Sequence, residues 1–139
     1  MKNLRKAAES GDADAQLQLG FAYLNGEGVA RNEARAVEWW MKAAEQGNDK
    51  AQFNLGVAYD KGDGVARDEA KAVEWWIKAA EQGNLKAQYN LLRAYAHGEG
   101  VVQDEKKALK WLLMMAEQGD LAALSALKKM NAVRLTEKF

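Results

Sequence analysis

Two groups of residues have the chemical types that enzymes use. Ser125 and Lys128 form a Ser-x-x-Lys pair, the spacing found at the acylated serine of some hydrolases, and His97 is the one histidine. Neither the Lys-Thr-Gly nor the Ser-Asp-Asn sequence that completes such a hydrolase follows Ser125, and the chain has no cysteine. His97 lacks a second histidine for a metal site or a nearby carboxylate cluster for proton transfer. The sequence therefore predicts no enzyme, no metal and no cofactor, with a hydrolase as a remote alternative.

The five tryptophans could instead form a platform on which bases or sugars stack. They are Trp39, Trp40, Trp75, Trp76 and Trp111, so the same positions recur at a spacing of 36 residues. A recurrence of this kind favours packing in a hydrophobic core over ligand binding. We expect the indoles to form the wall that neighbouring helices share.

The overall composition excludes several other classes of protein. The chain has 139 residues, of which 48% are hydrophobic, and its 20 Lys and Arg balance 20 Asp and Glu. A chain without net charge has no general field to hold a nucleic acid or an anionic membrane. No apolar run has the length of a membrane span, and the N-terminal residues lack the apolar core of a signal peptide. We expect a monomer that is cytoplasmic as given, or periplasmic or secreted if it has been processed.

A repeat with a period of 36 residues organises the chain. Alanine recurs at 15, 51, 87 and 123, glycine at 26, 62 and 98, and tyrosine at 23, 59 and 95. Periods of this length are typical of stacked helical arrays. The sequence predicts a single repeat domain, 1–139. It contains a partial N-terminal helix in 1–10, complete units in 11–46, 47–82 and 83–118, and a partial unit with a capping helix in 119–139.

Each unit has the pattern of a helical hairpin. In the second unit, Ala51, Leu55 and Tyr59 lie on one face of a first helix, and residues 68–82 carry a second apolar face. Asx residues precede each stretch as N-caps, and a Gly-x-Gly turn, Gly62 to Gly64, joins the two. The fold class predicted is therefore all-α.

The repeated residues also resemble a known family. Ala51-Gln52-Phe53-Asn54-Leu55-Gly56 and Ala80-Glu81-Gln82-Gly83-Asn84 match the pattern of Sel1-like repeats, which are tetratricopeptide-like, over residues 7 to 127. The resemblance implies a right-handed α/α superhelical solenoid that acts as an adaptor for other proteins. The strong likeness between units leaves open a consensus-designed or structural scaffold without a natural ligand.

Two glycines depart from helix propensity in an informative way. Gly20 and Gly56 fall in the middle of first helices, where glycine costs about 1 kcal/mol relative to alanine. The third unit has Leu92 at this position and Leu112 where the others have a second tryptophan. We predict that the two positions touch, so that Gly20 packs on Trp40, Gly56 on Trp76 and Leu92 on Leu112.

By analogy with peptide-binding tetratricopeptide domains, the resemblance implies a concave groove lined by the first helix of each unit. The predicted binding residues are those that the core stripe leaves free: Leu17, Phe21, Leu24, Lys50, Phe53, Val57, Lys86, Tyr89, Arg93, His97 and Lys129. Their apolar members lie mainly in the first units and their basic members in the far half. This distribution suits a protein or peptide ligand that is apolar at one end and acidic at the other.

Overall fold

The computed structural model describes the backbone of residues 1–137 and the side chains of residues 1–131. This part of the chain forms helices and no strand, which confirms the all-α fold class. The helices are α1 (Lys2–Glu9), α2 (Ala13–Asn25), α3 (Glu33–Glu45), α4 (Asp49–Lys61), α5 (Glu69–Glu81), α6 (Leu85–His97), α7 (Glu105–Glu117) and α8 (Leu121–Glu137). The predicted capping helix ends at Glu137 as described, and Lys138 lies outside the described residues.

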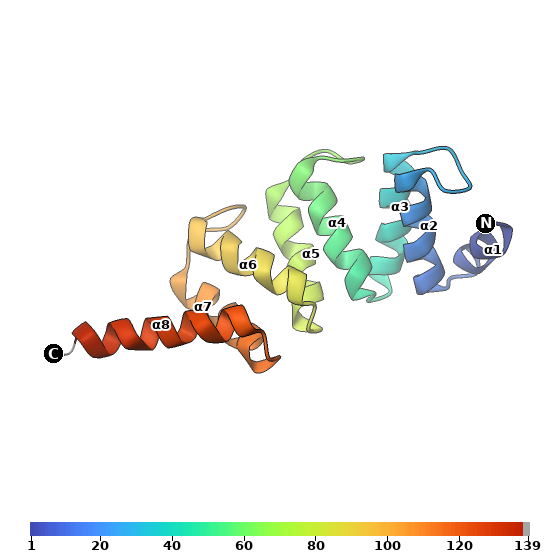
Figure 1. Ribbon diagram of the computed structural model, residues 1–139. Helices are drawn as coiled ribbons and strands as arrows, with labels where there is room; N and C mark the ends of the chain where they lie inside the picture. Colours follow the sequence, from blue (N-terminus) through green and yellow to red (C-terminus); the bar gives the residue numbers. More distant parts are fainter. Residues whose placement is uncertain (138–139) are drawn as a thin grey trace.

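The helices stack as hairpins in chain order. Figure 1 shows α2 beside α3, α4 beside α5 and α6 beside α7, with α1 at one end of the row and α8 at the other. Each helix packs on its neighbours in the sequence, as a solenoid requires. The predicted array of helical hairpins is confirmed.

The predicted caps and turns set the ends of the helices. Asn48 Oδ1 accepts a hydrogen bond from the Ala51 amide at 2.9 Å, and Asp68 caps α5 in the same way. Gly62 ends α4 with a φ of +73°, and Gly64 follows with +77°. A backbone with a φ in this left-handed range is strained for most residues other than glycine. The two glycines therefore allow the tight turn that joins the two helices of a unit.

A close contact between α4 and α5 explains the glycine in the middle of the first helix. The indole Nε1 of Trp76 donates to the Phe53 carbonyl of α4 at 3.3 Å. A Cβ at Gly56 would lie 2.3 Å from that nitrogen, so a side chain there would displace the indole. Trp40 and Gly20 repeat this geometry, with Trp40 donating to the Leu17 carbonyl. The predicted contacts of Gly20 with Trp40 and of Gly56 with Trp76 are confirmed. A side chain at either glycine would block the indole that donates the hydrogen bond.

The third unit uses the same volume differently. The Leu112 side chain has no N–H to donate, and Leu92 packs against the buried cluster that contains Leu112. A leucine pair therefore fills the space that glycine and tryptophan fill in the first two units. This outcome is the predicted one.

The tryptophans divide into two groups. Trp40, Trp76 and Trp111 are buried, as expected for a shared wall between helices. Trp39 and Trp75 are only half-buried, and the ammonium groups of Lys42 and Lys78 lie 4.3 Å and 4.5 Å from their ring centroids. Trp39 and Trp75 nevertheless pack against the core cluster, so the expected core packing holds for them while part of each indole stays at the surface.

Buried glutamines join successive units. Gln52 is 4% exposed, its amide nitrogen donates to the Ala44 carbonyl at 3.1 Å, and its oxygen accepts from Gln82 at 2.9 Å. Gln16 makes the equivalent bonds in the first unit. In the third unit Gln88 donates to the Ala80 carbonyl, but its oxygen has no partner. The glutamine ladder therefore weakens toward α8.

We expect Gln52→Leu to lower the free energy of unfolding by about 1–3 kcal/mol, because the Gln52 side chain loses one buried and one part-buried hydrogen bond. Urea unfolding followed by circular dichroism measures the change. The matched control is Gln88→Leu, which removes one bond and one unsatisfied oxygen and should cost less. An equal cost for the two variants would show that the ladder does not stabilise the array.

Candidate peptide-binding groove

Three adjoining hollows run along the first helices α2, α4 and α6. Their volumes are about 190, 290 and 330 Å³ in chain order. Phe21 and Asn54 line both the first and the second hollow. Phe53, Leu85 and Lys86 line both the second and the third. Because neighbouring hollows share walls, they form one continuous groove, which we call the first-helix groove.

The middle hollow has an apolar floor and a cationic rim. Phe21, Phe53 and Leu85 supply the apolar surface, and Lys50 and Lys86 stand at its edge. Both lysines are exposed, and neither forms an ion pair with a described residue. The Lys86 ammonium lies 6.0 Å from the Phe53 ring centroid, so it is held above the hollow. A ligand with an apolar side chain beside a carboxylate fits this chemistry.

The third hollow exposes the most aromatic surface. Tyr89 on α6 is 55% exposed and Leu85 is 39% exposed, although both are large apolar groups. The carboxylate of Asp120, at the start of α8, also lines this hollow. Exposed apolar groups that gather in one concavity are typical of protein contact sites.

The first hollow is narrower and more acidic. Leu24 and Val57 line it together with the buried ring of Trp40. The Phe21 ring meets Trp40 edge to face, with centroids 5.4 Å apart, and this contact fixes the Phe21 ring against the core. Glu33 and Asp63 also line the hollow. Lys61 lines this hollow as well. The first and third hollows therefore each combine a carboxylate with a lysine, whereas the middle hollow has lysines and no carboxylate.

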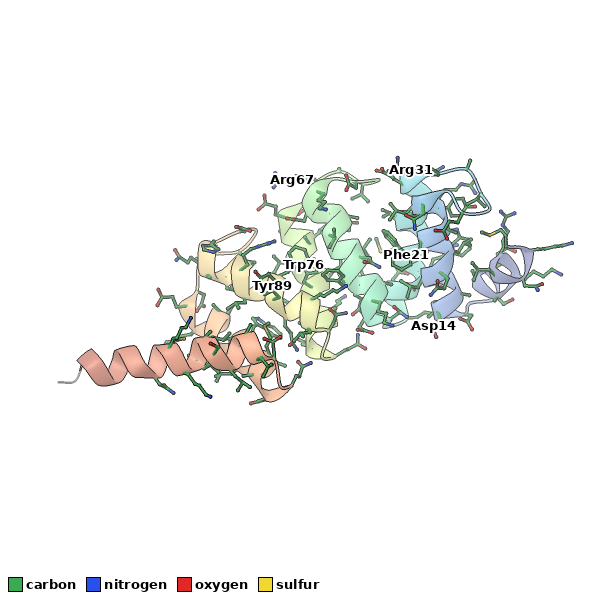
Figure 2. The ribbon with its side chains drawn as sticks, in the orientation of Figure 1. Asp14, Phe21, Arg31, Arg67, Trp76 and Tyr89 are labelled. Carbon is green, nitrogen blue, oxygen red and sulfur yellow. The ribbon has the colours of Figure 1, made fainter. Side chains whose placement is uncertain are left out.

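The structure brings together most of the predicted binding residues. Seven of them line the groove: Phe21, Leu24, Lys50, Phe53, Val57, Lys86 and Tyr89. Figure 2 shows Phe21 on α2 and Tyr89 on α6, with α4 between them.

Leu17 does not lie on the groove surface. It is 4% exposed and belongs to the core cluster that contains Trp40 and Ala51, so the expectation that the core leaves it free was wrong. Its short side chain stays between the helices. The longer rings of Phe53 and Tyr89, at the equivalent positions of the next units, extend from the core to the surface.

Three more of the predicted residues, two cations and His97, also lie outside the three hollows. Arg93 pairs with Glu99 at 3.6 Å, His97 is the exposed last residue of α6, and Lys129 is exposed on α8. The structure therefore does not gather the basic far half that the sequence suggested. The cations of the middle hollow are Lys50 and Lys86.

Sequence reasoning missed several residues that line the groove, among them Asn54, Asn84, Leu85 and Asn90. Asn54 and Asn90 stand 36 residues apart on the first helices, and this recurrence was a usable signal. Asn84 and Leu85 begin α6 and reach the groove only because α6 stacks on α4. Their contribution depends on the packing of units, which no local pattern reports.

Comparison with known proteins identifies the repeat. The sequence profile of the Sel1 repeat matches residues 1–12, 13–48, 49–84 and 85–120, which is most of the chain. The chain belongs to the Sel1 repeat family. The Sel1 repeats in this profile begin two residues after the boundaries drawn from the 36-residue period.

Solved structures of other Sel1 repeat proteins resemble this one. A protective antigen of uropathogenic Escherichia coli, c5321, is 44% identical with a TM-score of 0.83, over 91% of this chain and 27% of that one. A Sel1 repeat protein from Oxalobacter formigenes is 43% identical with a TM-score of 0.75, over 80% of this chain and 44% of that one. Helicobacter pylori cysteine-rich protein B is 26% identical with a TM-score of 0.69, over 90% of this chain and 95% of that one.

These Sel1 relatives fix the class of function and leave the partner unnamed. No curated protein sequence matches the chain. The chain spans 27% and 44% of the length of the first two similar structures. Sel1 repeat proteins are generally protein–protein interaction modules and are typically helical scaffolds without enzyme activity. Within residues 1–137, no helix combines the length and the hydropathy needed to cross a bilayer.

Proposed function

We propose that this Sel1 repeat protein is an adaptor that binds an extended segment of a partner protein in the first-helix groove. The observation that carries the proposal is the continuity of the three hollows along α2, α4 and α6. The groove leaves Phe53 half-buried and Tyr89 exposed, although rings of this size stabilise a protein most when they are covered. A partner segment laid across the groove would cover both rings.

The distribution of charge specifies the ligand further. Lys50 and Lys86 flank the middle hollow, whereas Glu33 and Asp63 line the first and Asp120 lines the third. A segment with an apolar side chain for the middle hollow and an acidic residue next to it would match this pattern. The acidic residue is therefore proposed near the centre of the bound segment, in place of the acidic end suggested by the sequence.

Selection from a random peptide library tests the proposal. We expect the protein to select peptides with an apolar residue adjacent to Asp or Glu. Phe53→Ala and Tyr89→Ala should each weaken binding of a selected peptide by about 2 kcal/mol or more, close to a 30-fold rise in Kd, because central aromatic groups dominate such interfaces. Fluorescence anisotropy measures the Kd.

Val102→Ala is the matched control, because Val102 is apolar and 87% exposed but lies outside the groove. Its Kd should equal that of the unchanged protein. Selected peptides that bind the Phe53→Ala, Tyr89→Ala double variant with unchanged affinity would contradict the proposed site. Failure to select any peptide would favour the scaffold without a ligand.

A further inference from the structure

Three arginines converge on a separate hollow at the N-terminal end of the array. Arg5 of α1, Arg31 of the loop between α2 and α3, and Arg35 of α3 line a cavity of about 510 Å³. Figure 2 shows Arg31 on that loop. Tyr23 and Asn32 line the same cavity, and no residue that lines it carries a carboxylate. The groups that face this cavity are therefore cationic or neutral hydrogen-bonding groups.

Two of the three guanidinium groups are already held in place. Arg31 Nε donates to the Leu24 carbonyl at 3.0 Å, and its terminal nitrogen pairs with Glu33 at 2.6 Å. Arg35 donates to the Tyr23 hydroxyl at 3.2 Å and lies 5.7 Å from the Tyr23 ring centroid. Arg5 forms no ion pair with a described residue. A ligand would meet preordered donors, which lowers the entropic cost of binding.

The other units provide an internal comparison, because the same loop recurs with different residues. The second unit has Met41 in place of Arg5 and Asp68 in place of Asn32, and it keeps Arg67 and Lys71. The third unit keeps only one cation, Lys107, and it also has an aspartate, Asp104, at the Asn32 position. The formal charge of these four positions thus falls from +3 to +1 to 0 along the array.

The first unit has Asn32 where the other two units have Asp68 and Asp104. This difference changes the charge of the loop but not the helix cap. Asn32 Oδ1 accepts from the Arg35 amide at 3.1 Å, as Asp68 accepts from Lys71 at 3.0 Å. Both residues cap a helix equally well. The neutral amide, however, adds no second carboxylate beside the Glu33 that pairs with Arg31, so Arg5 and Arg35 form no ion pair with a described residue.

We propose that this N-terminal cavity binds a phosphomonoester dianion. A phosphate group carries close to two negative charges and three acceptor oxygens, and planar guanidinium groups bind such oxygens in pairs. A carboxylate offers one charge, which would balance only one of the two arginines, Arg5 and Arg35, that have no carboxylate partner among the described residues, whereas a dianion balances both. The phosphate could belong to a phosphorylated side chain of a protein or to a small phosphate ester.

Titration of isotopically labelled protein with inorganic phosphate tests the site, at constant ionic strength and at a pH where the dianion dominates. We expect saturable shifts of the Arg5, Arg31 and Arg35 Nε resonances with phosphate, and much weaker shifts with acetate. Parallel titrations with a phosphoserine peptide and with glucose 6-phosphate distinguish the two sources, because the true source should bind more tightly than inorganic phosphate.

Asn32→Asp is the decisive variant, because Asp68 and Asp104 show that the loop folds with this residue. It should weaken phosphate binding by about fivefold or more, since repulsion from one negative charge close to the anionic ligand costs about 1 kcal/mol. Arg67→Met, in the equivalent loop of the second unit (Figure 2), should leave binding unchanged. Equal shifts at Arg67, equal binding of acetate, or no effect of Asn32→Asp would overturn the proposal.

Discussion

Replacing Trp76 with alanine is expected to lower the free energy of unfolding by about 3–5 kcal/mol, as truncation of a buried large aromatic side chain does. Trp76 is 3% exposed, and its indole N–H is bonded to the Phe53 carbonyl. The alanine variant loses this bond and opens a cavity between α4 and α5. Urea unfolding followed by circular dichroism measures the change, with unfolding of separate units allowed in the analysis.

Two matched variants show whether burial is the cause. Trp75→Ala changes the adjacent indole, which is only half-buried under Lys78, and it should cost clearly less. A Gly56→Leu, Trp76→Leu double variant copies the leucine pair of the third unit and should recover part of the lost stability. If Trp75→Ala cost as much as Trp76→Ala, the packing described here for the second unit would be incorrect.

Gly64→Ala is expected to lower the free energy of unfolding by about 2–5 kcal/mol, from the sum of backbone strain and overpacking. Gly64 has a φ of +77°, and a Cβ there would lie 2.5 Å from the Glu33 carbonyl oxygen of the preceding unit. The obstacle is backbone at the first turn of α3, so no side-chain rotation can relieve it. The turn of one unit would have to move away from the helix of the unit before it.

The matched control for this variant is Gly47→Ala. Gly47 has a φ of +95°, but a Cβ there would meet no atom within 4 Å. It should therefore cost only the strain of the left-handed backbone, about 1–2 kcal/mol. Thermal unfolding of the two variants compares them directly. Equal losses of stability would mean that the contact between Gly64 and Glu33 contributes nothing to the stacking of units.

The repeat made much of the fold predictable from the sequence. Most helix boundaries follow from an Asx cap or a glycine that recurs every 36 residues, so the same signal appears in several units. The exchange of Gly56 and Trp76 for Leu92 and Leu112 even indicated a contact between two helices. Covariation inside one chain thus supplied tertiary information that a single copy would lack.

The candidate groove was predictable only in part. The helical period separated the groove face from the core face, and it identified Phe53 and Tyr89 correctly as lying outside the buried core. It failed for Leu17, because the depth of a side chain between stacked units depends on its length as well as its direction. Leu85 lines the groove because α6 stacks beyond α4, and no local sequence pattern predicts that stacking.

The charges were harder to predict than the apolar surface. Arg93 pairs with Glu99 across a turn, whereas Lys50 and Lys86 have no such partner among the described residues. Long cationic side chains can reach several partners, so their positions along a helix do not determine their neighbours. The arginine cavity likewise depends on the packing of α1 against the next unit, which places Arg5 beside Arg35.

The most direct test of the central claim is to map where a library-selected peptide binds, by amide chemical-shift changes in labelled protein. The groove account predicts that the changes cluster on α2, α4 and α6 around Phe53 and Tyr89, and that the second helices α3 and α5 change little around Trp39 and Trp75, which do not line the groove. Changes concentrated on those second helices, around the half-buried rings of Trp39 and Trp75, would contradict it.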